Sequence, residues 1–152
     1  MTRINANIPV ANLTDQHLRA EHREIVRVCG KYEKRLKKTI DTGIDHISMT
    51  HNFKMGQGHE LFFVDKGAFT LNRYRNLRDE CKRRGFETSD FEHAWRVYRK
   101  QDMKWHNFTE AENNLVRERI RTRLVDSSQI PRHEKTNISV DQAINMINRL
   151  AE

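Results

Sequence analysis

The sequence is poor in the residues that interrupt helices or build covalent frameworks. It contains two prolines, six glycines and two cysteines in 152 residues. Proline and glycine are the least favourable residues in helix interiors, so their scarcity favours a largely helical chain. Two cysteines are too few for a disulfide-rich secreted fold, and Cys29 and Cys81 are most simply buried thiols. No apolar run approaches the roughly 18 residues of a membrane span, and no signal peptide is recognisable, so we expect a cytoplasmic protein.

The charge balance is strongly basic. Lysine and arginine number 28 against 21 aspartates and glutamates, which gives a formal net charge of +7 and a pI of about 9.7. Such a balance favours a polyanionic partner: DNA, RNA or an acidic membrane surface. The length is typical of one domain, which is large enough to bury a modest core without a metal or disulfide.

Helical periodicity predicts an all-α fold of three main helices and a short carboxyl-terminal helix. The main helices are expected to begin near Thr14 or Asp15, at His59 or Leu61, and at Thr109. The second should stop at Gly85, because a glycine after several cations is a common helix end. A loop is expected over 42–57, a short helix near 90–99 and a final helix from Ser139. We therefore assign residues 1–125 to one helical unit, with 126–152 forming a loop and an amphipathic helix packed on it.

The first helix is amphipathic. Leu18, Ile25, Cys29, Tyr32 and Leu36 recur at helical spacing and should face the core. Its opposite face carries Gln16, Ala20, Arg23 and Arg27, bordered by His17 and Glu24. In the third helix Ala111, Leu115, Ile120 and Leu124 should form the apolar face, whereas Arg119 and Arg123 share another.

Five arginines would form a phosphate-binding surface if the amino terminus passed between the first and third helices: Arg3, Arg23, Arg27, Arg119 and Arg123. Guanidinium groups match phosphate oxygens with paired hydrogen bonds. Composition alone favours the simpler interpretation that the arginines lie on solvated helix faces. The spacing also allows Glu24 to be an ordinary surface ion-pair partner. Removal of Met1 would free the α-amine of Thr2, whose reference pKa of about 7.7–8.0 leaves part of it neutral and nucleophilic. The pattern by itself favours an ordinary start site for Thr2.

A metal site is not expected. His17, Glu21 and His22 are spaced one residue too long for the inverted zinc-protease motif, and no cluster of cysteine and histidine has zinc spacing. No organic cofactor is implied either.

Three strings resemble one known family when taken in order: Met-Thr-Arg-Ile-Asn at 1–5, Leu-Thr-Asp-Gln-His-Leu at 13–18 and Glu-His-Arg-Glu at 21–24. They are similar to the amino terminus of the phage-type pyrimidine-dimer DNA glycosylase/AP lyases, also called endonuclease V of the phage type. The similarity resumes at 54–66 and 80–86, and more weakly at 105–124. The resemblance implies a compact helical domain with the amino terminus threaded between helices. It also implies a protein that acts on DNA in the cytoplasm, which would be the host cell's cytoplasm if a phage encodes it.

The resemblance also implies the roles of individual residues. Thr2 would be the nucleophile through its α-amine, and Glu24 the catalytic carboxylate. The remaining positions would contact DNA: Arg3, Gln16, His17, Arg23, Arg27, Arg119 and Arg123. The first expectation is that the protein excises a cyclobutane pyrimidine dimer from double-stranded DNA without a metal ion. The resemblance also implies a monomer that extrudes a base from the duplex. The carboxyl end departs from the family, because no aromatic residue follows Phe108, and this leaves open another damaged or modified base. A non-catalytic DNA-binding protein is the main alternative, and a metal-dependent nuclease a more remote one.

Overall fold

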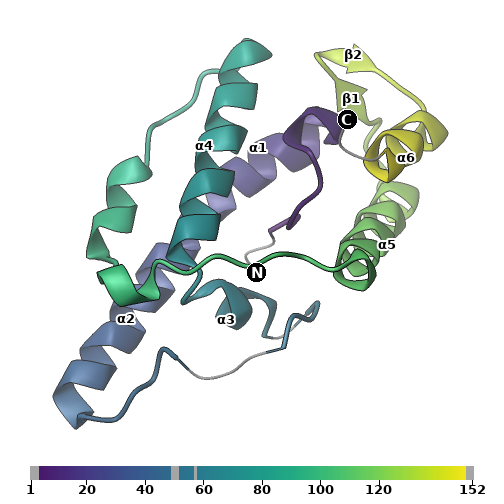
Figure 1. Ribbon diagram of the computed structural model, residues 1–152. Coiled ribbons are helices and arrows are strands. Elements are labelled where there is room, and N and C mark those ends of the chain that lie inside the picture. The colour runs from purple at the N-terminus through teal and green to yellow at the C-terminus, as the bar shows by residue number, and fades with distance from the viewer. Residues whose placement is uncertain (1–3, 49–51, 57, 150–152) are drawn as a thin grey trace.

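The computed structural model describes residues 4–48, 52–56 and 58–149, so Thr2 and Arg3 lie outside the described residues. The predicted all-α class is confirmed, because the only sheet in the described part is one two-residue hairpin (Figure 1). More α-helices occur than expected, because the first two predicted main helices are each divided, whereas the short helix predicted near 90–99 is a 3-10 segment. The α-helices are α1 (Asp15–Glu24), α2 (Arg27–Thr42), α3 (His59–Phe63), α4 (Gly67–Arg83), α5 (Glu110–Asp126) and α6 (Val140–Asn148); β1 (Arg132–His133) and β2 (Thr136–Asn137) form the hairpin. Short 3-10 turns cover Val10–Asn12, Glu92–Val97 and Lys100–Asp102.

The predicted first helix is broken at Ile25 and Val26, so the expectation of one continuous helix is wrong. Val28 N–H bonds to the carbonyl of Ile25 at 3.1 Å, and Cys29 N–H bonds to that of Val26 at 3.0 Å. These bonds span three residues, as in a 3-10 turn, and interrupt the α-helical ladder between α1 and α2. Ile25 and Val28 are both fully buried on either side of the break, so the bend lets both helices present apolar residues to the core.

The predicted second helix is also divided, into α3 and α4, by a turn over Val64–Lys66. Gly67, at the start of α4, lies against Met103 and Tyr98 so closely that a Cβ would come within 2.5 Å of the Met103 sulfur. The turn therefore packs on the loop that follows the 3-10 segments. The predicted stop is confirmed: α4 ends at Arg83 and Gly85 has a φ of 82°.

Both predicted capping boxes are present, and they set the start of α5 and of α6. Thr109 and Glu112 cap α5 reciprocally, and Ser139 and Gln142 cap α6 in the same way. The predicted apolar face of α5 needs correction, because Leu115 is 49% exposed and Ala111 is exposed as well. The buried residues are instead Val116, Ile120 and Leu124, spaced four apart. Ala143 and Ile147 of α6 are buried in the same core as this face.

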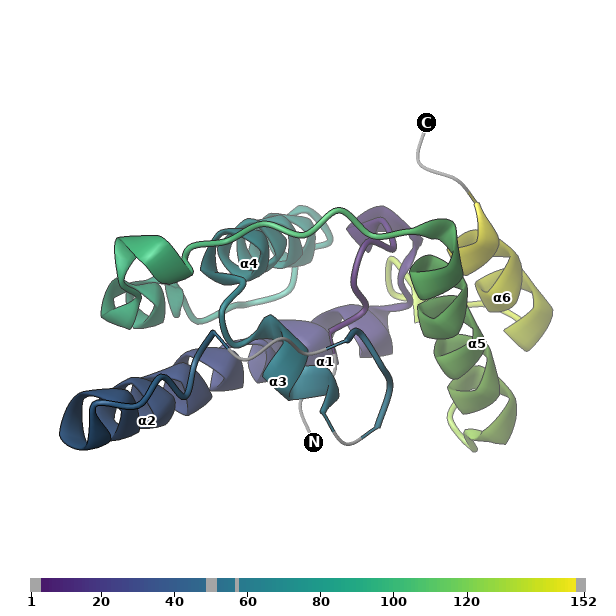
Figure 2. The same cartoon turned by 60° about the horizontal axis from the view of Figure 1, so that its bottom comes forward.

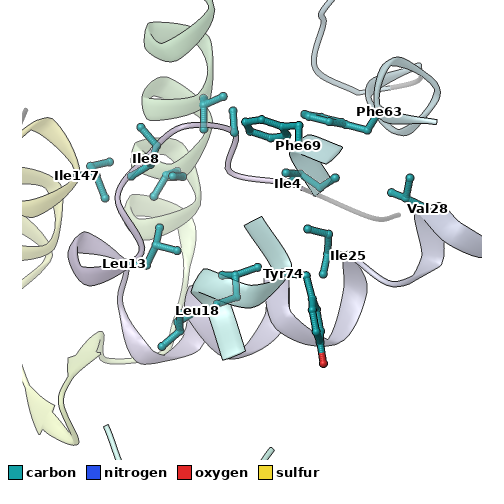
Figure 3. Packing of buried hydrophobic residues seen from close by; sticks show 14 of the residues in the cluster. Ile4, Ile8, Leu13, Leu18, Ile25, Val28, Phe63, Phe69, Tyr74 and Ile147 are labelled. Carbon is teal, nitrogen blue, oxygen red and sulfur yellow. The ribbon is translucent and has the colours of Figure 1, made fainter. Parts of the chain in front are cut away.

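The amino-terminal segment runs through the core, as expected. Ile4, Ala6 and Ile8 are each 0% exposed, and Figure 3 shows Ile4 and Ile8 lying among residues of the surrounding helices. Burying each of the two isoleucine side chains contributes roughly 1.5–3 kcal/mol. The side chain of Asn5 bonds to Glu21 of α1 and to Arg119 of α5, so this segment bridges two helices that are distant in sequence.

The hairpin, which was not predicted, fastens the carboxyl-terminal part to the start of α1. Asp15 accepts hydrogen bonds from the backbone N–H groups of Glu134 at 3.0 Å and Lys135 at 2.7 Å. These two residues form the hairpin turn with φ values of 51° and 68°, and hairpin turns of two residues require such positive angles. Within the described residues, no helix has the length and hydropathy needed to cross a membrane.

Candidate active site

A cleft of about 1380 Å³ lies between the polar face of α1 and α5. In the view of Figure 2, α5 stands to the right of α1. Gln16, His17, Ala20 and Arg23 line it from α1, and Arg119 and Arg123 line it from α5. Residues 126–135, which lead from α5 into the hairpin, form a further part of its wall.

A smaller recess of about 270 Å³ adjoins this cleft and shares His17, Ala20, Arg119 and Arg123 with it. Its remaining lining residues are Asn5, Glu21 and Glu24. Four of the predicted site residues therefore meet here from two helices: His17, Glu24, Arg119 and Arg123. Glu24 is half-buried at the last position of α1, with its side chain beside two guanidinium-bearing residues of α5.

The other predicted residues lie at different distances from this recess. Gln16 and Arg23 line the larger cleft only. Arg27 is exposed on the first turn of α2 and lines neither cavity. Thr2 and Arg3 are outside the described residues. The structure thus gathers the core of the predicted set and leaves Arg27 beyond the break that ends α1.

A buried polar network, which helical periodicity does not predict, holds together the elements that line the recess. Glu21 is 1% exposed and accepts two hydrogen bonds from Arg73 of α4, at 2.7 and 3.0 Å. Glu21 also accepts a bond from the Asn5 side-chain amide at 2.7 Å, and the amide oxygen of Asn5 accepts from Arg119. The chain Arg73–Glu21–Asn5–Arg119 therefore joins α4, α1, the amino-terminal segment and α5. The sequence pattern around Glu21 does not indicate this role, because its partner Arg73 is 52 residues away.

His17 is neutral at physiological pH. Burial, and secondarily the charge of Arg119, lower the pKa of its imidazole to about 4. The Thr14 hydroxyl, which accepts the His17 backbone N–H at 3.2 Å, lies 2.9 Å from Nδ1 of the ring. The hydroxyl can donate its own hydrogen to Nδ1, and this arrangement leaves the proton of the neutral ring on Nε2. His17 then offers an uncharged donor within the recess.

Gln16 is engaged by the carboxyl-terminal part of the chain. Its amide nitrogen donates to the carbonyl of Ile130 at 2.7 Å, and its amide oxygen accepts from the backbone N–H of Arg132 at 3.0 Å. The side chain therefore joins the wall at 126–135 to α1. In the structure as it stands, holding this wall is the contact that Gln16 makes.

Positive charge predominates along the cleft. Its cationic lining residues are Arg19, Arg23, Arg119, Arg123, Arg132 and Lys135, and its acidic ones are Asp15, Glu118 and Asp126. Asp15 is neutralised by Arg84 at 2.9 Å, and Glu118 by Arg121 at 2.5 Å. The remaining field suits a polyanion such as a nucleic-acid backbone. Among residues 4–48, 52–56 and 58–149, no three histidine, cysteine or acidic side chains are arranged to hold a metal ion.

Comparison with protein-family models identifies the chain. The model described as pyrimidine dimer DNA glycosylase matches residues 1–93, which is more than half of the 152-residue chain. The match includes the amino-terminal segment, α1 and α4, and therefore Asn5, Glu21, Glu24 and Arg73 of the recess and its support. It ends before α5, which supplies Arg119 and Arg123. The chain belongs to the pyrimidine dimer DNA glycosylase family.

Proposed function

We propose that the protein is a bifunctional DNA glycosylase and AP lyase that excises a pyrimidine dimer through an imine formed with the α-amine of Thr2. The observation that carries the proposal is that Asn5 and Glu24 line one recess together with Arg119 and Arg123. Thr2 precedes Asn5 by three residues in the sequence, so the proposal brings its amine to the recess that Asn5 and Glu24 line.

The glycosylase step replaces one bond at the sugar with another. The lone pair of the Thr2 amine forms a bond to C1′ of the deoxyribose, while the C1′–N bond breaks and its electron pair leaves with the pyrimidine, which takes up a proton. The amine then loses one proton as C1′ becomes an iminium and the C1′–O4′ bond breaks to open the ring. O4′ takes up that proton, and the proton on the released pyrimidine comes from solvent. Glu24, as a carboxylate, stabilises the developing positive charge and transfers protons.

The lyase step uses the same covalent intermediate. Removal of a proton from C2′ forms the C2′–C3′ double bond, and the C3′–O bond breaks with its electron pair on the departing phosphate. Hydrolysis then releases the amine from the sugar. The step needs no added oxidant or reductant, because the iminium supplies the electron sink.

The cationic groups of the cleft would hold the duplex. In this proposal Arg23, Arg119 and Arg123 bind phosphates that flank the extruded nucleotide, and Arg27, which lies outside both cavities, binds a phosphate further along the duplex. Arg3 and Gln16 remain predicted DNA contacts, as does His17, whose neutral ring can donate to a sugar or base oxygen without adding charge. Extrusion of the nucleotide gives access to C1′, which is otherwise hidden in the stacked duplex.

The test is borohydride trapping on duplex DNA carrying a cyclobutane pyrimidine dimer, with abasic and undamaged duplexes in parallel, all in EDTA. Protein processed at Met1 should give a covalent adduct and strand cleavage. Glu24→Gln should lose at least 100-fold in cleavage while its Kd for DNA changes less than about threefold. Glu33→Gln, which removes the same charge from an exposed position on α2, is the matched control and should behave as wild type.

Each outcome has a defined meaning. DNA binding that falls steeply with salt, without an adduct on any duplex, would refute the enzyme and support the non-catalytic alternative. Cleavage that disappears in EDTA would support a metal-dependent nuclease instead. A trapped adduct on abasic DNA but not on dimer DNA would retain the imine chemistry and assign the recess to a different base.

A further inference from the structure

His59 forms the contact that ties the amino-terminal segment to α3. It is 1% exposed at the first position of that helix. Its Nε2 lies 3.0 Å from the backbone nitrogen of Ile4 and 3.1 Å from the Ile4 carbonyl oxygen, and its Nδ1 lies 3.1 Å from the carbonyl oxygen of Lys54. A buried histidine with both ring nitrogens on backbone atoms is held in one orientation.

The neutral tautomer with its proton on Nδ1 satisfies two of these three contacts. With its proton on Nδ1, the ring donates to the Lys54 carbonyl, and its unprotonated Nε2 accepts the Ile4 N–H. The opposite tautomer satisfies one, by donating from Nε2 to the Ile4 carbonyl. It would leave the Ile4 N–H without this acceptor and would turn the Nδ1 lone pair toward the Lys54 oxygen. The aromatic rings of Phe53 and Phe63 meet the imidazole edge-on, with centroids 5.6 and 5.2 Å away, so the ring cannot swing aside easily.

The next residue along the chain is fixed independently. Asn5 is bound through its side chain to Glu21 and Arg119, and Ala6 follows with a φ of 46°, an angle that non-glycine residues adopt only under constraint. Ile4 and Asn5 are therefore anchored consecutively, by α3 on one side and by α1 and α5 on the other. Only Thr2 and Arg3 separate these anchors from Met1.

We propose, on the basis of the function proposed above, that His59 is a positioning residue that aims the amino terminus at the recess by accepting the Ile4 N–H on an unprotonated Nε2. Displacing a reacting atom by about 1 Å can reduce a rate by about 100-fold. The α-amine is two residues from Ile4 in the sequence. Loss of this hydrogen bond would therefore allow the backbone of Ile4 to shift and the proposed nucleophile to shift with it. Loss of the bond should slow imine formation and leave DNA binding by the cleft arginines intact.

The electrostatic surroundings keep this acceptor available. Arg119 of α5 and Glu21 of α1 are the charged groups that act on the ring, with opposite effects, and the carbonyls of Lys54 and Ile4 face it directly. Burial, followed by Arg119, lowers the pKa of His59 to about 4. The hydrogen bond to Ile4 should thus persist at neutral pH and be lost as the pH falls through 4.

The experiment compares His59→Phe, His59→Gln and wild type in single-turnover borohydride trapping at pH 7.5. Phenylalanine keeps the ring but removes the acceptor, and should slow adduct formation by about 10- to 100-fold with the Kd for DNA within about threefold. Glutamine can place an amide oxygen near the Nε2 position and should restore at least half of the lost rate on a logarithmic scale. The control is His22→Phe, a buried histidine stacked on Tyr74, whose Nε2 has no hydrogen-bond partner within the described residues; it should change neither quantity.

The outcomes separate this inference from the proposed function. Absence of a wild-type adduct refutes the function itself. A wild-type adduct with equal trapping by His59→Phe, or a parallel loss of trapping and DNA affinity, refutes the positioning role alone. Nitrogen NMR of the folded wild type provides a test independent of variants: a proton on Nδ1 supports the inference, and a proton on Nε2 overturns it.

Discussion

Removing the carboxylate of Glu21 should destabilise the protein severely. Its side chain is 0% exposed and that of Arg73 is 6% exposed, and the two are joined by two hydrogen bonds. Hydrogen bonds to charged groups contribute roughly 1.5–3 kcal/mol each, and breaking one partner of a buried ion pair typically costs about 3–5 kcal/mol. Glu21→Met removes the carboxylate that pairs with the Arg73 guanidinium and that accepts from the Asn5 amide. We therefore expect the free energy of unfolding to fall by about 3–5 kcal/mol.

The measurement is urea unfolding followed by circular dichroism, arranged as a double-mutant cycle with Arg73→Met. Because the double variant has no unpaired buried charge, it should be more stable than Glu21→Met alone. Glu118→Gln is the control, since its pair with Arg121 is 61% and 49% exposed and should be worth under about 1 kcal/mol. If Glu21→Met and Glu118→Gln cost the same, the buried network does not stabilise the fold in the way its geometry indicates.

Two further predictions concern pH and the arginine at the end of α4. The pKa values of His17 and His59 are lowered from 6.5 to about 4 in the folded protein. As the pH falls, these histidines therefore take up protons in the unfolded state before they do so in the folded state. The contribution of the two neutral rings to the free energy of unfolding is fully present above pH 6.5 and is lost as the pH falls toward 4. Chemical unfolding should show a loss of about 3–4 kcal/mol between pH 7.5 and 5, and a flat profile would contradict buried neutral rings. The side chain of Arg84 is 0% exposed and binds Asp15, Glu80 and the backbone carbonyls of residues 10, 11 and 13. Arg84→Lys should lower the free energy of unfolding by roughly 2–4 kcal/mol, because an ammonium group cannot reproduce the hydrogen bonds of the planar guanidinium. A melting temperature within a degree of wild type would refute that expectation.

Helix starts could be predicted from the sequence because caps are local. Thr14, Thr109 and Ser139 each accept the backbone N–H three residues later, and the residues needed for this bond are adjacent in the sequence. The glycine stop after α4 is local for the same reason. Such signals require no knowledge of the rest of the fold.

The helix breaks were not predictable in this way. Neither Ile25–Val26 nor Val64–Lys66 contains proline or glycine, and each break arises because flanking residues pack on distant segments. Leu115 was assigned to the core by spacing alone. The choice between it and Val116 depends on the rotation of α5 against the amino-terminal segment and α6, which only the assembled core determines.

The site shows the same division. Amphipathicity placed His17 and Glu24 beside one another at the border of the polar face, and the recess contains both. Amphipathicity cannot distinguish a buried charge from a solvated one. It therefore does not predict that Glu21, Arg73 and His59 make the buried hydrogen bonds around the amino-terminal segment. The role of Thr2 rests on family resemblance and mechanism, since helical pattern carries no information about a terminal amine.

The cleft is also a boundary between two stretches of the chain. One side, α1 with the segment threaded beside it, lies within the range matched by the family model, and the other side, α5 with residues 126–135, lies beyond it. The two share a hydrophobic core and are joined by hydrogen bonds that include those of Asn5, Asp15 and Gln16. Sequence change in the later stretch can therefore alter the width and lining of the cleft while the opposite side keeps its shape. In such an arrangement, the lining contributed by α5 can diverge without rebuilding the half that carries Glu24.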